Sequence, residues 1–321
     1  MQPKFEKKIA RACFILFLAI TVLSASSCST WNWLWSREEN SINVKDLVIG
    51  EIEPSEETGK IFEEVVEYTG KAHSGTDICY LGKANSPHQS RVIVIDAGHQ
   101  LKGSSALEPN GPGSAIMKAE VTTGAEGGVG NTYQAEYELN LQVALRLCKE
   151  LIDRGYSVVM IRETNNVNIS NMERAQIANK YNAAAYIRIH ANSWTDESMR
   201  GAMTICQSAN NPYPDCATHY EESRMLSQLV LNEFCRETGI QQLDIREMDD
   251  MTGTNWSRVP TTIVEMGFMS NPYENTLMKS DYFRVEAAQG IANGLDAYFE
   301  WLEMQTETET TAETLADTNH P

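Results

Sequence analysis

Two histidines each follow a short apolar run that has the composition of a buried strand. His99 closes the run at 91–99 (RVIVIDAGH), and His190 closes the run at 185–190 (AYIRIH). Such β-branched runs are typical of buried strands, and open α/β sheets bind ligands at the carboxyl ends of their strands. The chain has only six histidines, so two at strand ends favour one shared metal ion over two unrelated structural side chains.

A catalytic zinc ion usually has three protein ligands and one open position, and His/His/carboxylate is a common set. Glu136 and Glu138 both stand where the first long helical pattern begins. An acidic side chain there also interacts favourably with the positive end of a helix without any metal. By chemistry alone the two glutamates are equal candidates for the third ligand.

The elements that must position these side chains alternate between strand and helix patterns over residues 91–302. This alternation predicts one α/β domain with a mixed, mostly parallel β-sheet and helices on both faces. Strands are expected at 92–96, 157–161, 185–189, 202–206 and 261–265. Helices are expected at 138–153, from a capping box at Ser170 and Glu173 to Lys180, around 225–230, and at 288–302.

The first 28 residues have the pattern of an export signal: basic residues, an apolar run at 12–23 and then small residues. The apolar run is shorter than the ~20 residues that a transmembrane helix needs. Residues 25–28 resemble a bacterial lipoprotein cleavage site, which predicts lipidation at Cys28 and a protein anchored outside the cytoplasmic membrane. Simple cleavage with secretion, or an uncleaved anchor, are the alternatives. Residues 29–90 are expected to be a partly disordered spacer, and 303–321 an acidic disordered tail.

The formal net charge of −18 argues against nucleic acid as a partner and against a polybasic grip on lipid, since both need basic patches. No CxxC pair occurs, so a cysteine-ligated zinc site is not expected. Cys206 and Cys216 are candidates for a disulfide in an exported protein. Cys148 and Cys235 lie in helical patterns and are predicted to be buried.

Four motifs occur in a fixed order along the chain: Asp96-x-Gly-His99, Glu136-x-x-x-Asn140-Leu141, His190-x-Asn192 and Val264-Glu265-x-Gly-Phe-x-Ser-Asn271. In these motifs residues 91–302 resemble the zinc-dependent N-acetylmuramoyl-L-alanine amidases of the AmiC-like, Amidase_3 type. The resemblance implies Zn²⁺ as cofactor with His99, Glu136 and His190 as ligands, and Glu265 as a catalytic glutamate. Arg162, Arg174 and Asn179 also match. Gln100 and Leu101 depart from the two glycines that often follow the first histidine in the family.

The implied reaction is hydrolysis of the amide between N-acetylmuramic acid and L-alanine in bacterial peptidoglycan. Zinc activates water and polarises a carbonyl, and a free carboxylate such as Glu265 can move the proton to the leaving amine. Asn192 is expected to hydrogen-bond substrate or to hold a loop. Arg246 is a candidate to bind a substrate carboxylate, with an exposed structural arginine as the alternative. The Gly-rich stretch at 103–132 is expected to be a surface loop or a rim of the site.

The expected partners are peptidoglycan and, through the N-terminal anchor, the membrane; the sequence identifies no protein activator. Another zinc peptidase or amidohydrolase on the same ligands remains an alternative. A second alternative is a non-catalytic peptidoglycan-binding protein. Loss of a metal ligand or of the catalytic glutamate would favour it, but His99, Glu136, His190 and Glu265 are all present.

Overall fold

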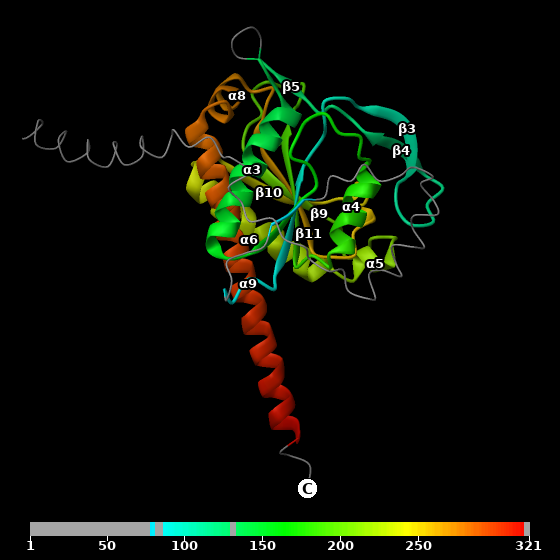
Figure 1. Ribbon diagram of the computed structural model, residues 1–321, viewed down its shortest axis with the longest axis vertical. Coiled ribbons are helices and arrows are strands. Elements are labelled where there is room, and N and C mark those ends of the chain that lie inside the picture. The colour runs from blue at the N-terminus through cyan, green and yellow to red at the C-terminus, as the bar shows by residue number, and fades with distance from the viewer. Residues whose placement is uncertain (1–77, 81–85, 129–132, 318–321) are drawn as a thin grey trace, which may run out of the picture. The chain divides into compact units, whose positions relative to one another are not determined.

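The computed structural model describes residues 78–80, 86–128 and 133–317. Its centre is a seven-stranded sheet with the strand order β1-β7-β2-β8-β11-β9-β10 (Figure 1). The strands are β1 (Ile78–Tyr80), β2 (Val92–Ala97), β7 (Ser157–Met160), β8 (Ala185–Asn192), β9 (Ala202–Cys206), β10 (Gln242–Glu247) and β11 (Thr261–Phe268). Neighbours from β7 to β11 pair in parallel, as do β9 and β10, whereas β1 pairs antiparallel with β7 and β9 antiparallel with β11. The predicted mixed, mostly parallel sheet is confirmed.

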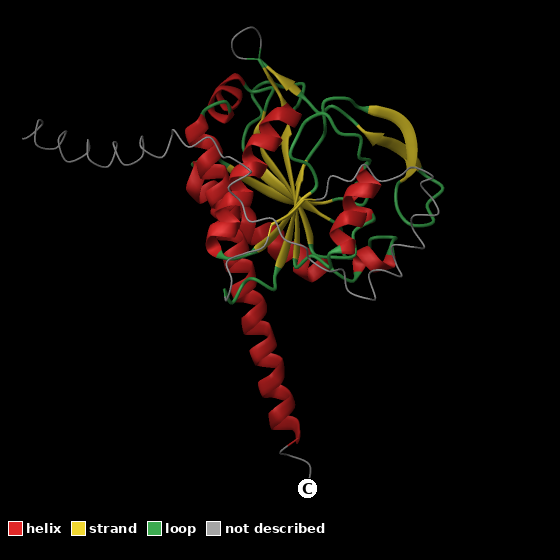
Figure 2. Cartoon of the chain, in the orientation of Figure 1, coloured by secondary structure: helices red, strands yellow, loops and turns green. Residues whose placement is uncertain are grey.

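Helices cover both faces of this sheet (Figure 2). On one face α3 (Glu136–Arg154) packs on β2, β7 and β8, while α6 (Tyr220–Thr238) packs on β9 and β11. The helix α9 (Asp281–Asp317) then packs on α3 and α6. On the other face lie α4 (Asn171–Lys180) and α7 (Thr252–Asn255), which contact each other. The short helices α5 (Pro214–Ala217) and α8 (Pro272–Met278) complete the set among the described residues.

The expected strands form because both faces of the sheet are covered. Every residue of β7 and β9 is buried, so neither strand shows the alternation of a half-buried strand, and each has only one polar residue, Ser157 or Thr204. The helix α4 begins as its capping box predicts: Ser170 Oγ accepts from Glu173 N at 3.2 Å, and Glu173 Oε2 accepts from Ser170 N at 2.8 Å.

Several elements lie where the sequence predicted none. The stretch expected to be a loop at 103–132 contains β3 (Ser104–Pro109), which pairs antiparallel with β4 (Met117–Val121), and β5 (Glu126–Gly127), which pairs antiparallel with β6 (Gln134–Ala135) just beyond the stretch. β1 lies in the predicted spacer, and β10 is an edge strand with a largely exposed sequence. These strands are short or exposed, so they carry no buried apolar run that sequence reasoning can detect.

The last helix also extends further than its apolar pattern. That pattern ends at Leu302, but α9 continues to Asp317, through most of the segment whose composition predicts a disordered tail. Glutamate, glutamine, methionine and alanine are good helix formers, and adding residues to an existing helix is far easier than starting one. Residues 303–308 of this extension are exposed.

Cys206 and Cys216, the candidate pair for a disulfide, are not bridged. Both are free and buried, as are Cys148 and Cys235. Cys216 Sγ instead donates to the backbone oxygen of Thr254 at 3.2 Å. Burial raises the pKa of the Cys206 thiol to about 11 and that of Cys216 to about 12, so both remain protonated and unreactive. The burial of Cys148 and Cys235 is confirmed.

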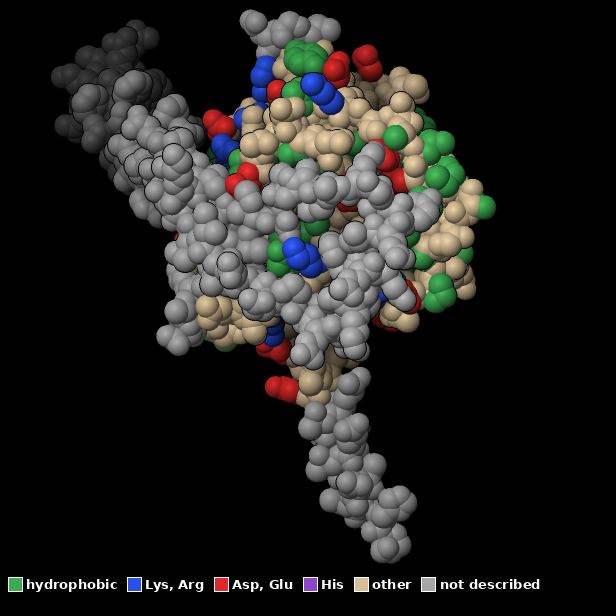
Figure 3. Space-filling view, turned by 45° about the vertical axis from the view of Figure 1, so that its right-hand side comes forward, with side chains coloured by type: hydrophobic (Ala, Val, Ile, Leu, Met, Phe, Trp, Pro, Cys, Tyr) green, Lys and Arg blue, Asp and Glu red, His purple; other side chains and the backbone are tan. Residues whose placement is uncertain are grey.

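The predicted signal and the lipidation site at Cys28 lie outside the described residues. Within the described part of the chain, no helix is both long and apolar enough to span a bilayer. On the face of that part seen in Figure 3, Lys and Arg side chains are interspersed with Asp and Glu.

Candidate metal centre

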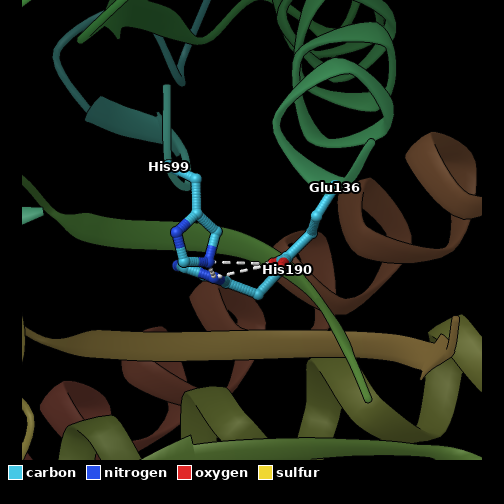
Figure 4. Close-up of side chains that lie close together, drawn as sticks. All are labelled: His99, Glu136 and His190. Atoms are coloured by element: carbon cyan, nitrogen blue, oxygen red, sulfur yellow. Dashed lines mark hydrogen bonds and ion pairs between the residues drawn. The ribbon is translucent and has the colours of Figure 1, made fainter. Parts of the chain in front are cut away.

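Three segments that are distant in the sequence bring His99, Glu136 and His190 together (Figure 4). β2 and β8 pair in parallel with Ala97 opposite Ile189, so their carboxyl ends are adjacent. His99 follows β2, His190 lies near the end of β8, and Glu136 is the first residue of α3. The predicted convergence of the two histidines at one sheet edge is therefore what the fold produces.

The three side chains present one atom each to a common point. His99 Nε2 lies 3.1 Å from Glu136 Oε1 and 3.1 Å from His190 Nδ1, and His190 Nδ1 lies 3.2 Å from Glu136 Oε1. In a tetrahedral zinc site with bonds of about 2.0–2.1 Å, two ligand atoms are about 3.3 Å apart. The triangle therefore has the size of one face of a zinc tetrahedron.

The ring nitrogens that face this point are His99 Nε2 and His190 Nδ1. His99 Nδ1 lies 3.1 Å from the backbone oxygen of Thr122, and because a carbonyl only accepts, Nδ1 carries the proton and Nε2 is bare. His190 Nε2 is buried and has no partner among the described residues. Burial lowers the pKa of His190 to about 4, so it is neutral at pH 7. Two ring nitrogens and a carboxylate oxygen that face each other at this distance fit a bound cation when neither nitrogen carries a proton on that side.

Glu136 is held by contacts to both of its oxygens. Oε2 accepts from Ala125 N at 2.7 Å, and Oε1 accepts from Ala191 N at 3.1 Å. Burial alone would raise the pKa of Glu136, but hydrogen bonds and charge interactions with His190 and His99 outweigh it and hold that pKa well below its usual range. The carboxyl is therefore ionised, as a metal ligand must be.

The segment 122–125, which we call the ligand strap, touches two of the three ligands. Thr122 binds His99, and Ala125 binds Glu136. Between them, Gly124 has a φ of +82°, and a Cβ there would lie 2.5 Å from Glu136 Oε2 and 2.7 Å from His99 Cδ2. Only glycine fits this position, because a side chain would displace the ligands and L residues rarely adopt that φ.

Two fully buried arginines hold the turn that carries His99. Arg162 donates from Nε to the oxygen of Ala97 at 2.7 Å and from Nη2 to that of Gly98 at 3.0 Å. Arg174 donates to the oxygen of His99 at 3.1 Å. His99 has a φ of +62°, a conformation that a non-glycine residue keeps only when its surroundings enforce it. Here the two guanidinium groups stabilise this conformation by donating hydrogen bonds to the backbone oxygens of residues 97, 98 and 99.

The charge of Arg174 is balanced by Asp96, which it contacts at 2.6 Å, and Asp96 also contacts Arg188 at 3.0 Å. Burial would raise the pKa of Asp96, but the two arginines hold it well below its usual range. Gln100, the departure from the glycine pair of the family motif, joins this network because its Oε1 accepts from Arg174 Nη2 at 3.0 Å.

Glu265 lies beside the three candidate ligands but is not one of them. It sits on β11 directly opposite His190 of β8 in parallel register, so the two side chains emerge on the same face of the sheet. Its Oε2 is buried without a hydrogen-bond partner in the described part of the chain. Burial, and next the charge of Glu136, raise the pKa of Glu265 to about 8. A carboxyl perturbed in this way is typical of proton-transfer groups.

The other predicted site residues lie further out. Glu138 is exposed on α3, so the structure brings Glu136 rather than Glu138 to the histidines. Asn192 ends β8, and its backbone oxygen accepts from Met269 N at 2.7 Å, which holds the next loop. Arg246 is exposed on β10, three strands from β8 and so roughly 14 Å away. The structure does not bring Arg246 together with the three ligands.

Sequence reasoning missed the ligand strap. Its residues form no strand or helix, and the one signal they carry is Gly124, which does not differ in sequence from other loop glycines.

Comparisons with family models, curated proteins and solved structures all indicate the same protein family. A family model described as N-acetylmuramoyl-L-alanine amidase matches residues 93–297. The uncharacterized protein YqiI of Bacillus subtilis is 26% identical over 218 residues, 68% of this chain and 89% of its own length. The N-acetylmuramoyl-L-alanine amidase AmiA of Escherichia coli is 23% identical over 257 residues, covering 70% of this chain and 81% of AmiA. The crystal structure of the amidase Ami1 from Mycobacterium smegmatis shares the fold, with a TM-score of 0.57, 23% identity, and coverage of 65% of this chain and 96% of that one. The chain therefore belongs to the N-acetylmuramoyl-L-alanine amidase family, whose members are hydrolases.

Proposed function

We propose that this protein is a zinc-dependent enzyme that cleaves the amide between the lactyl group of N-acetylmuramic acid and the L-alanine of the stem peptide. Family membership supports the reaction. Zinc binding is supported above all by one observation: His99 Nε2, Glu136 Oε1 and His190 Nδ1 form a triangle with separations of 3.1–3.2 Å. In these surroundings Glu136 is ionised and His190 is neutral.

Zinc held at this triangle supplies a Lewis acid that polarises the scissile carbonyl and lowers the pKa of water. The protein's own contribution is to keep the three ligands fixed and to place the carboxyl of Glu265 next to them. In its ionised form Glu265 takes the proton of the attacking water and passes it to the nitrogen of the leaving L-alanine. A cation bound at the triangle would favour that form by offsetting the charge of Glu136, which contributes to the raised pKa of Glu265. Its position opposite His190 supports this role.

Export and anchoring belong to the same proposal. Residues 1–28 carry the pattern of a signal with a lipidation site at Cys28. Retention at the outer face of the cytoplasmic membrane would place the domain beside its polymeric substrate. We propose Asn192 as a residue that holds the rim of the site.

Mass spectrometry of a peptidoglycan digest tests the reaction directly. We expect free stem peptides that begin with L-alanine and glycan chains that retain an intact lactyl group. Release of terminal amino acids would identify a peptidase instead, and an unchanged polymer would identify a binding protein.

His99→Ala and His190→Ala should lose stoichiometric zinc and hydrolysis together, and full activity in a zinc-free preparation would rule out the metal.

A further inference from the structure

A tryptophan stands on the surface directly beyond the strand that carries His190. Trp194 is 61% exposed, although tryptophan is highly buried on average. It is the fourth residue after His190, so the two Cα atoms are at most about 14 Å apart. An exposed aromatic ring at this distance from a reaction centre lies within reach of a polymeric substrate that occupies the centre.

The loop that carries Trp194 is held in place at several points. Trp194 N donates to Ser270 Oγ at 3.0 Å, and the oxygen of Glu197 accepts from Asn271 Nδ2 at 2.9 Å. Gly201 N donates to Glu274 Oε1 at 2.7 Å. These contacts tie residues 193–201 to the segment that follows β11. The indole is therefore presented by a fixed support, which reduces the ordering entropy that binding would otherwise lose.

A second exposed aromatic residue lies on the same edge. Tyr273, in the first turn of α8 just after β11, is 70% exposed. Its backbone N donates to Asn271 Oδ1 at 3.1 Å, and Asn271 is the residue that also anchors the Trp194 loop. We call Trp194, Tyr273 and the loop 193–201 the aromatic shelf.

We propose that the aromatic shelf binds the glycan strand of peptidoglycan, with an N-acetylhexosamine ring stacked on Trp194. This inference rests on the proposed function. In that substrate the scissile carbonyl is joined to the muramyl ring through only the lactyl carbon and an ether oxygen, so a sugar must lie beside the metal triangle. The neighbouring sugars then extend along the rim of the site.

The chemistry of the shelf favours a sugar over the stem peptide. The C–H groups on one face of a hexosamine ring pack against the negative face of an aromatic ring, while the hydroxyl groups need polar acceptors. The loop provides such acceptors in the exposed side chains of Asp196 and Glu197, against one exposed cation, Arg200. A stem peptide rich in carboxylates is disfavoured next to that acidic pair.

A binding experiment separates the glycan from the peptide and needs no turnover. The full chain carrying Glu265→Gln is titrated calorimetrically with chitohexaose, a β-1,4-linked N-acetylglucosamine oligomer without peptide. We expect binding that Trp194→Ala weakens at least tenfold, equivalent to about 1.4 kcal/mol, and that Trp194→Phe largely restores. Trp301→Ala is the matched control: Trp301 lies near the other end of the sheet, two residues after Phe299, whose ring packs under Arg91 just before β2.

Equal affinity of Trp194→Ala and its parent for chitohexaose, or no binding of chitohexaose by the parent, would overturn the proposal. So would binding of the free stem peptide that is lost with Trp194→Ala. If chitohexaose binding depends on Trp194 but the wild-type protein releases no stem peptide, the shelf stands and the proposed hydrolysis fails.

A kinetic test adds a second readout. For a soluble tetrasaccharide that carries stem peptides, Trp194→Ala should raise KM about tenfold with a much smaller change in kcat. For N-acetylmuramoyl-L-alanyl-D-isoglutamine, which has one sugar, KM should change less than twofold. Equal effects on both substrates would indicate that Trp194 does not act on the extended glycan.

Discussion

Gly124→Ala tests whether the ligand strap holds the metal site. A Cβ at this position would lie 2.5 Å from Glu136 Oε2, whereas ordinary van der Waals contact begins at 3.4 Å. The carboxylate must therefore retreat by the difference, 0.9 Å. Zinc–ligand distances tolerate only about ±0.2 Å. The hydrogen bond from Ala125 N to the same oxygen, 2.7 Å in the wild type, would be lost in the same movement.

We expect Gly124→Ala to weaken zinc binding by about 100-fold, the upper end of what disturbing outer contacts to a metal ligand causes, or about 2.7 kcal/mol. The φ of +82° adds about 1–2 kcal/mol of backbone strain, which lowers folding stability without acting on the metal.

Gly113→Ala is the matched control. Gly113 has a similar φ of +72°, but a Cβ there meets nothing within 4 Å. Zinc affinity is measured by competition with a chromophoric chelator, and stability by urea unfolding of the metal-free protein. Both variants should lose similar stability, and only Gly124→Ala should lose zinc affinity. Equal zinc affinities in the two variants would refute the reasoning, because the strap would then not determine the ligand geometry.

Three further predictions address other parts of the chain. Glu265→Gln should lower kcat at least ~100-fold while zinc remains bound; loss of zinc would instead make Glu265 a ligand. Glu108, buried on β3, accepts from Met172 N at 3.1 Å, and burial raises its pKa from 4.5 to about 7. The folded protein thus holds this proton more tightly than the unfolded chain, so the stability it contributes is full below pH 4.5 and is lost as pH rises through 7. Glu108→Gln should remove this loss, so urea unfolding at pH 5 and pH 8 should favour the variant more at pH 8; a constant difference would contradict the shift. Finally, a palmitate analogue should label the wild-type protein but not Cys28→Ala, and an unlabelled wild type would favour secretion or an uncleaved anchor.

The inner strands of the central sheet were predictable because burial on both faces leaves a direct trace in the sequence, whereas the edge strands β1 and β10 were not. β9 spans the predicted 202–206, and α4 begins and ends where its capping box and last lysine indicate. The other predicted elements are present with shifted ends. Terminal residues depend on tertiary contacts, as in α9, where the helix continues past its apolar pattern.

The candidate site was only partly predictable. Strand-end histidines indicated that a metal site was present, and the family motif selected Glu136. Chemistry alone did not separate Glu136 from Glu138, since both begin the same helix. Their orientation decides it: Glu136 is buried against the histidines, and Glu138 faces solvent. Similarly, the sequence left open whether Cys206 and Cys216 form a disulfide, and the structure shows that both are free, with the Cys216 thiol donating to the backbone oxygen of Thr254.

By itself the sequence indicated the fold class, the positions of the main strands along the chain and the two histidines of the candidate metal site. These features depend on local composition and on residue chemistry. Only the tertiary structure decided how the ligands are aimed. The strap at 122–125 and the carbonyl contacts of Arg162 and Arg174 orient them. These contacts run through backbone atoms, which are the same in every residue, so the sequence carries no trace of which carbonyl or amide a side chain will meet.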